Sequence, residues 1–133
     1  MLTGGLCCVR LHRTGGENFK ERMTNPTIDF EKAGGLVAGI VQDATTGQML
    51  MLGFLNEESY AKTLESGFVT FYSRTRNKLW MKGETSGNRL KIVTASTDCD
   101  NDALLFRVTV EGDGLVCHEG TVSCFTKEIE VTK

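Results

Sequence analysis

Three aspartates stand at every second position of the stretch Thr97–Asp102, and no other stretch of the sequence places so many potential ligands together. In an extended backbone alternate side chains point to the same side, so we expect Asp98, Asp100 and Asp102 to share one face and Cys99 to point the other way. Carboxylate oxygens suit Mg²⁺ or Ca²⁺ and a thiolate suits Zn²⁺, so this stretch can address two different metals. A solvated acidic turn is the alternative interpretation.

An EF-hand calcium loop also begins with aspartates at alternate positions, and it can be excluded. Its sixth position requires Gly and its twelfth requires Glu. Ala103 and Thr109 occupy these positions here.

A second set of possible metal ligands consists of Cys99, Cys117 and Cys124, with His118 next to Cys117. Their spacing differs from the short C-x2-C pairs of structural zinc sites, so buried free thiols remain an alternative. Three thiolates with an open fourth position would suit a catalytic zinc, which lowers the pKa of a bound water to ~7. His118 is then either a fourth ligand or an acid–base group beside that water, and we favour the second role.

Basic residues concentrate between residues 74 and 91, which hold six of the fifteen lysines and arginines against one acid, Glu84. Three of them alternate and would project from one face of an extended chain, where they could bind phosphate oxygens: Arg74, Arg76 and Lys78. A solvated charged face is the common alternative.

The residues that follow add two features. Trp80, the only tryptophan, would either stack on a base or pack in the core, which is the commoner use. Residues 83–88 form a Gly-containing loop that can bring backbone N–H groups close to an anion.

The elements that must position these residues can be predicted from local patterns. Asn56 is a good N-cap and Gly67 a good stop, which predicts one principal helix over about residues 56–66. Short runs of β-forming residues predict strands at 36–42, 49–54, 68–72, 90–96, 103–111 and, by alternation at the terminus, 126–131. About seven strands to one helix, joined by local hairpins, indicate an α+β fold with a mainly antiparallel sheet.

Length and composition indicate one domain. Residues 1–25 lack sustained periodicity and are predicted to be a disordered extension, with Met23 an alternative first residue, and residues 26–133 form the domain. A net charge of −2 argues against non-specific nucleic-acid binding, and no apolar run is long enough to span a membrane. Five cysteines without a secretory signal indicate reduced thiols and a cytoplasmic protein.

Four motifs in order resemble the phosphoribosyl-AMP cyclohydrolases of histidine biosynthesis. They are Ser73–Trp80 (SRTRNKLW), Lys82–Asn88 (KGETSGN), Thr97–Asp102 (TDCDND) and Cys117–Phe125 (CHEGTVSCF), within a similarity over about residues 35–125. The sequence departs from the family in two respects: Asn101 replaces a usual Gly, and Thr121 and Val122 replace residues that are often basic. Because Asn also tolerates a left-handed backbone, the turn around Asn101 should survive.

The resemblance implies hydrolytic opening of the purine ring of phosphoribosyl-AMP between N1 and C6. It implies Mg²⁺ on Asp98, Asp100 and Asp102. It also implies one Zn²⁺ per subunit on Cys99, Cys117 and Cys124, with Cys99 reaching the site of the partner subunit in an intertwined homodimer. We predict that the nucleotide is contacted by polar and basic residues of the first two motifs, namely Ser73, Arg74, Arg76, Lys78, Trp80, Lys82, Glu84, Ser86 and Asn88.

Two other functions remain open at this point. A small zinc-stabilised module would use its thiols structurally and bind RNA through the basic segment, although the acidic net charge disfavours it. A related metal-dependent hydrolase acting on another activated purine nucleotide has the same sequence features.

Overall fold

The computed structural model describes residues 25–132. The predicted N-terminal extension therefore lies, except for its last residue, outside the described residues.

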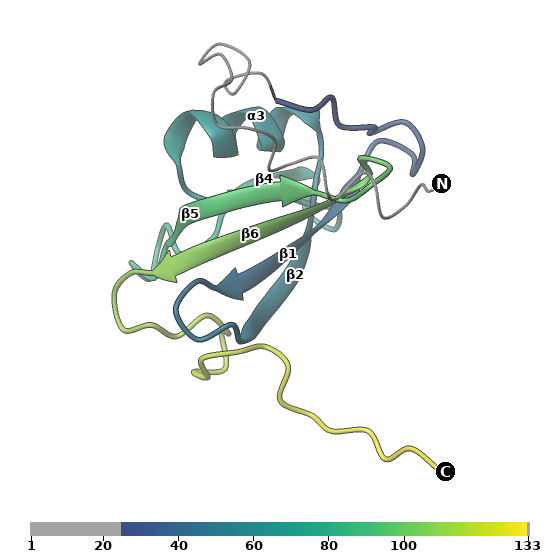
Figure 1. The fold of residues 1–133 in the computed structure, drawn as a ribbon. Coiled ribbons are helices and arrows are strands. Elements are labelled where there is room, and N and C mark those ends of the chain that lie inside the picture. Colours follow the sequence, from purple (N-terminus) through teal and green to yellow (C-terminus); the bar gives the residue numbers. More distant parts are fainter. Residues whose placement is uncertain (1–24, 133) are drawn as a thin grey trace, which may run out of the picture.

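A four-stranded sheet forms the centre of the molecule (Figure 1). Its strands, in spatial order, are β2 (Met49–Leu55), β1 (Val37–Asp43), β6 (Ala103–Val110) and β5 (Leu90–Thr97). The β1–β2 and β5–β6 pairs are antiparallel hairpins, as predicted, and β1 runs parallel to β6 between them. The fold is thus β-rich with one helix, and its sheet is mainly antiparallel.

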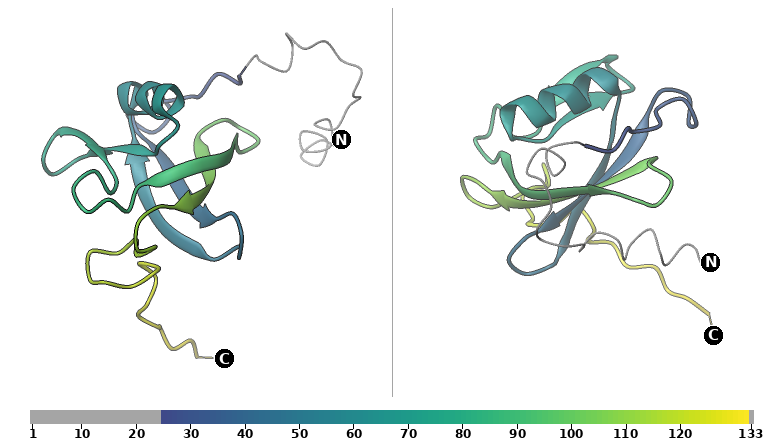
Figure 2. Two further views of the ribbon diagram at one scale, coloured as in Figure 1. Left: turned by 90° about the vertical axis from the view of Figure 1, so that its left-hand side faces the viewer. Right: turned by 45° about the horizontal axis from the view of Figure 1, so that its top comes forward.

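Helix α3 (Glu57–Ser66) and the two-stranded ribbon of β3 (Thr70–Ser73) and β4 (Lys78–Met81) lie on one side of the sheet (Figure 2). Local chemistry fixes the helix ends as predicted. The Asn56 side chain accepts from the Ser59 N–H while the Ser59 hydroxyl accepts from the Asn56 N–H, and Gly67 ends the helix in the left-handed conformation.

The core lies between the sheet and this second layer. Its largest fully buried side chains include Leu50, Leu55, Phe71 and Phe106. The ring of Phe71 packs directly on Gly53 of β2, where a Cβ would lie 2.6 Å from the nearest ring carbon. Gly53 therefore allows the ribbon to approach the sheet closely.

The structure corrects two strand predictions. Residues 126–132 belong to no strand among the described residues and extend away from the sheet, with Ile129 and Val131 86% and 71% exposed (Figure 1). Their alternating pattern is strand-like, but a strand also needs a neighbouring strand to pair with. Arg74 and Arg76 lie in the turn between β3 and β4 rather than in an extended segment, so they do not alternate with Lys78 along one strand.

The topology separates the two clusters of possible metal ligands. The turn containing the three aspartates precedes β6, and the segment containing Cys117 and Cys124 follows it. The seven steps between the eight residues of β6, at about 3.4 Å each, place the two clusters at opposite ends of a strand about 24 Å long.

Candidate functional site

A tight turn, rather than an extended strand, gathers the three aspartates. The Asn101 N–H donates to the Asp98 carbonyl at 3.1 Å, and Asn101 has a φ of 62°, so it adopts the left-handed backbone expected for this position. One Asp98 carboxylate oxygen accepts the N–H groups of Asp102 and Ala103 at 3.0 and 3.3 Å. The predicted clustering of the carboxylates is correct, but its cause is the turn and not the alternation of a strand.

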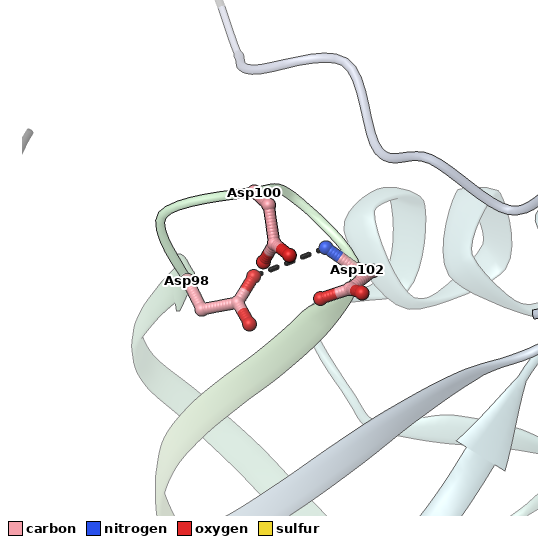
Figure 3. Close-up of side chains that lie close together, drawn as sticks. All are labelled: Asp98, Asp100 and Asp102. Carbon is pink, nitrogen blue, oxygen red and sulfur yellow. Dashed lines mark hydrogen bonds between the residues drawn. The ribbon is translucent and has the colours of Figure 1, made fainter. Parts of the chain in front are cut away.

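The three carboxylates converge on a common point inside the turn (Figure 3). One ligand oxygen from each of Asp98, Asp100 and Asp102 can be chosen so that all lie within 4.8 Å of one another. Octahedral Mg²⁺ binds oxygens at about 2.1 Å, which places ligand oxygens about 3 to 4.2 Å apart. The donor set therefore fits a hard divalent cation after small side-chain movements.

A lysine from the start of the domain contacts this cluster. The Lys32 ammonium lies 3.0 Å from Oδ2 of Asp100 and 3.3 Å from Oδ2 of Asp102. This ammonium holds the pKa of Asp100 below its ordinary value, and the two carboxylates raise the pKa of Lys32. The neighbouring Asp100, followed by desolvation, raises the pKa of Asp102. The crowding of negative charge thus makes a cation favourable here.

The second cluster lies on a loop that is attached to β2. The Ser123 hydroxyl is buried and donates to the Met49 carbonyl at 2.7 Å, and the Cys124 N–H donates to the Leu50 carbonyl at 2.8 Å. Within the loop, the Cys117 N–H donates to the Thr121 carbonyl at 3.0 Å. These bonds bring the two cysteines of the loop together.

The thiols of Cys117 and Cys124 lie close enough to perturb each other's pKa. The backbone N–H of Glu119 is the main cause of a lowered pKa at Cys117, whereas burial is the main cause of a raised pKa at Cys124, and the proximity of the two thiols contributes to both shifts. Lys82 lies near enough to favour the Cys124 thiolate. Two adjacent thiols with an exposed His118 beside them fit a soft metal such as Zn²⁺, which prefers thiolate ligands.

Cys99 is exposed and lies in the aspartate turn, at the other end of β6. Within residues 25–132 the three aspartates are the only group of three or more Cys, His, Asp or Glu side chains close enough to share an ion. One chain therefore brings together two of the three predicted thiol ligands.

The predicted nucleotide-binding residues divide between the two ends of the β3–β4 ribbon. Near its turn, the Arg74 guanidinium stacks 4.3 Å from the centre of the Phe54 ring, and the Ser73 hydroxyl accepts the Arg76 N–H at 3.2 Å. Phe54 pairs with Ala38, which in turn pairs with Ala103, so this end of the ribbon faces the aspartate end of the sheet. The exposed Lys78 follows the turn.

Loop 82–88 lies at the thiol end of the sheet. Asn88 is buried, donates to the Leu115 carbonyl at 3.0 Å and accepts the Asp113 N–H at 2.8 Å. This amide therefore joins the loop to the segment that leads into Cys117. Glu84 and Ser86 are exposed on the loop.

Trp80 packs against the core, with its ring centre 5.6 Å from that of Phe71. The Lys82 ammonium lies 5.4 Å from the centre of the Trp80 ring. The indole is only partly buried, and Lys82 at the start of loop 82–88 lies beside it.

Comparison with known proteins shows the family to which this chain is similar. Residues 51–126 match the family model described as phosphoribosyl-AMP cyclohydrolase. The phosphoribosyl-AMP cyclohydrolase of Solibacter usitatus is 52% identical over 103 residues, which cover 77% of this chain and 81% of the relative. The phosphoribosyl-AMP cyclohydrolase of Streptococcus mutans serotype c is 50% identical over 107 residues, which cover 80% of this chain and 96% of the relative.

A longer relative, the histidine biosynthesis bifunctional protein HisIE of Escherichia coli, is 56% identical over 98 residues. The match covers 74% of this chain but 47% of that relative, so the chain spans about half of the bifunctional protein.

The fold, the site and the relatives together define this protein as an enzyme of the hydrolase class. It is not a non-enzymatic zinc module. The chain belongs to the phosphoribosyl-AMP cyclohydrolase family. No helix within residues 25–132 is long and apolar enough to cross a membrane.

Lys32 is the residue of this region that sequence reasoning missed. It lies 68 positions before Asp100, and no spacing rule links an isolated lysine to a distant turn. Only the folded chain brings them together, through the hydrogen bond from the Asp29 N–H to the Asn101 carbonyl at 2.7 Å.

Proposed function

We propose that this protein opens the purine ring of phosphoribosyl-AMP by hydrolysis of the N1–C6 bond, a step of histidine biosynthesis. The observation that carries the proposal is the family match over residues 51–126, a range that includes the basic ribbon and both ligand clusters. The relatives of similar length carry this activity in their names.

The zinc site is proposed to form between two copies of the chain. Cys117 and Cys124 lie together, whereas Cys99 is exposed at the far end of β6. In a homodimer with two-fold symmetry, Cys99 of one protomer can complete the thiol pair of its partner. The same arrangement would bring the aspartate turn of one protomer towards Lys82 and loop 82–88 of the other.

The chemistry is the addition of water to C6, followed by cleavage of the C6–N1 bond. Cys99, Cys117 and Cys124 would hold a zinc ion, which would supply an acidified water as the nucleophile. His118, which is exposed and adjacent to Cys117, would take a proton from the water and return one to N1. C6 then becomes the carbon of a carboxamide, and N1 leaves as the N–H of the formimino group.

Two sets of residues are proposed to hold the phosphates. Asp98, Asp100 and Asp102 would bind Mg²⁺, whose remaining coordination positions suit phosphate oxygens. Arg74, Arg76, Lys78 and Lys82, with Ser73, Glu84, Ser86 and Trp80, would contact the nucleotide itself, whereas Asn88 would act indirectly by holding loop 82–88 in place. Because free thiolates are needed as ligands, we also place the enzyme in the reducing cytosol.

The direct test is an ultraviolet assay of ring opening with phosphoribosyl-AMP and purified protein supplied with Zn²⁺ and Mg²⁺. We expect turnover, and we expect Cys124→Ser to abolish it. Turnover of another N1-substituted purine nucleotide in place of phosphoribosyl-AMP would instead identify a related hydrolase and contradict the proposed substrate.

The two metal sites are expected to be separable. Asp100→Asn should weaken the dependence on Mg²⁺ and raise KM. The protein should keep its zinc, because the two metal sites have no ligand in common. Cys124→Ser should lose zinc and activity together. Metal analysis of both variants decides the point, and the two-site proposal is wrong if Asp100→Asn empties the zinc site as completely as Cys124→Ser does.

A further inference from the structure

The Lys32 ammonium contacts two of the three carboxylates that could hold a cation at the aspartate cluster. It lies 3.0 Å from Oδ2 of Asp100 and 3.3 Å from Oδ2 of Asp102. These oxygens belong to two of the three carboxylates that can surround one ion. A divalent cation bound between them would meet a positive charge a few ångströms away, so the ammonium and the ion compete for the same oxygens.

The backbone that carries Lys32 is held independently of this contact. The Asp29 N–H donates to the Asn101 carbonyl at 2.7 Å, and the Asp29 carboxylate accepts the Lys32 N–H at 3.1 Å. Ile28 is buried in the core. The side chain of Lys32, which is 43% exposed, can therefore leave the carboxylates while its segment stays docked.

Acidic residues beside the cluster can attract the ammonium of Lys32 after it is displaced. An open pocket of about 420 Å³ lies beside Asp100, and the residues that line it include Asp29, Glu31 and Glu57. These acids offer alternative partners within the same surface region, so release of Lys32 from the cluster leaves the ammonium close to negative charge.

We propose that Lys32 is a tethered counter-ion: it neutralises Asp100 and Asp102 when no divalent cation is bound and is displaced when one binds. This inference rests on the proposed Mg²⁺ site. It assigns Lys32 a positioning role, since it keeps the crowded carboxylates together before the ion arrives and lowers the affinity for the ion.

The sign of the effect separates this role from a structural one. If Lys32 competes with the cation, Lys32→Met should bind Mg²⁺ more tightly than the wild type. If Lys32 merely fastens the segment to the turn, its loss should loosen the cluster and weaken binding. Exposed ion pairs are individually weak, so we expect a gain in affinity of about three- to tenfold.

The experiment is calorimetric titration of the intact, zinc-loaded protein with Mg²⁺, which measures binding without reference to activity. Lys32→Met is compared with the wild type and with Lys62→Met, a control that removes an exposed lysine from helix α3. Lys32→Arg retains a cation that can bind both carboxylates and should leave the affinity at or below that of the wild type. Asp100→Asn, which lacks one of the proposed ligands, gives the background level of Mg²⁺ binding.

Each outcome is informative. Tighter binding by Lys32→Met alone supports the tethered counter-ion, and equal or weaker binding overturns it while leaving the metal site intact. If the wild type and Lys32→Met both bind no better than Asp100→Asn, the metal site itself is wrong and the inference fails with it. Should Lys32→Met not fold, tighter binding by Lys32→Arg than by the wild type would also refute the proposal.

Discussion

Replacing Asn88 with Ala should destabilise the protein because the amide joins two loops from inside. Its nitrogen donates to the Leu115 carbonyl at 3.0 Å and its oxygen accepts the Asp113 N–H at 2.8 Å. The side chain is packed tightly, since a Cβ on Gly112 would lie 2.1 Å from the Asn88 oxygen. Neither of the two backbone groups regains a protein partner when the amide is removed.

The expected cost follows from these two bonds. A hydrogen bond contributes about 0.5–1.5 kcal/mol net, so the loss of two predicts a decrease of about 1–3 kcal/mol in the free energy of unfolding. Urea unfolding at one fixed protein concentration measures it, because association would otherwise shift the apparent stability. Thr85→Ala, at an exposed position of the same loop, is the matched control and should change the free energy by less than about 0.5 kcal/mol.

A second variant, Asn88→Asp, tests the direction of the two hydrogen bonds of the Asn88 amide. Asn88→Asp keeps the acceptor for the Asp113 N–H but places a carboxylate against the Leu115 carbonyl, so it should be at least as destabilising as Asn88→Ala. An Asn88→Ala protein as stable as the wild type, but with a raised KM, would refute the reasoning. It would mean that the amide is available to the nucleotide rather than committed to the two loops.

Two further predictions concern the core and the catalytic step. Gly53→Ala should lower the free energy of unfolding by about 1–3 kcal/mol, because a Cβ would lie 2.6 and 2.7 Å from two carbons of the Phe71 ring; unchanged urea unfolding would contradict this packing. His118→Ala should lower kcat by about 10²- to 10⁴-fold while zinc content stays near that of the wild type, if His118 moves protons; parallel loss of zinc on elemental analysis would make it a ligand instead.

The parts of the fold that sequence predicted are those with local causes. The β1–β2 hairpin and helix α3 follow from a turn sequence, an N-cap at Asn56 and a terminating Gly67, each of which acts within a few residues. The parallel pairing of β1 with β6 was not predicted, because it joins segments that are distant in sequence and depends on the whole sheet. The exposed segment 126–132 shows the converse: a strand-like pattern remains unpaired when the described chain offers it no neighbour.

In the candidate site, too, features with local causes could be predicted and features that depend on tertiary packing could not. The aspartates could be found from their types and spacing, although the turn at Asn101, and not strand alternation, brings them together. Arg74 and Arg76 were assigned to an extended segment, whereas they lie in a turn that begins after Ser73. The contacts of Lys32 with the turn, and of Asn88 with Leu115, arise from tertiary packing and carry no sequence signal.

The central claim, that each zinc site is shared between two protomers, can be tested by mixing two inactive variants. Cys99→Ser and Cys117→Ser are co-expressed or co-refolded in equal amounts, and mixed dimers are verified by mass spectrometry. In a mixed dimer one site contains both substitutions. The other site combines an intact Cys99 from one protomer with an intact Cys117 and Cys124 from its partner.

Random association makes about half of the dimers mixed, and half of their sites are whole, so about a quarter of wild-type activity should return. Sites formed within single chains cannot be rescued, because every chain carries one broken ligand. Activity that stays at background although mixed dimers are present would contradict the shared site.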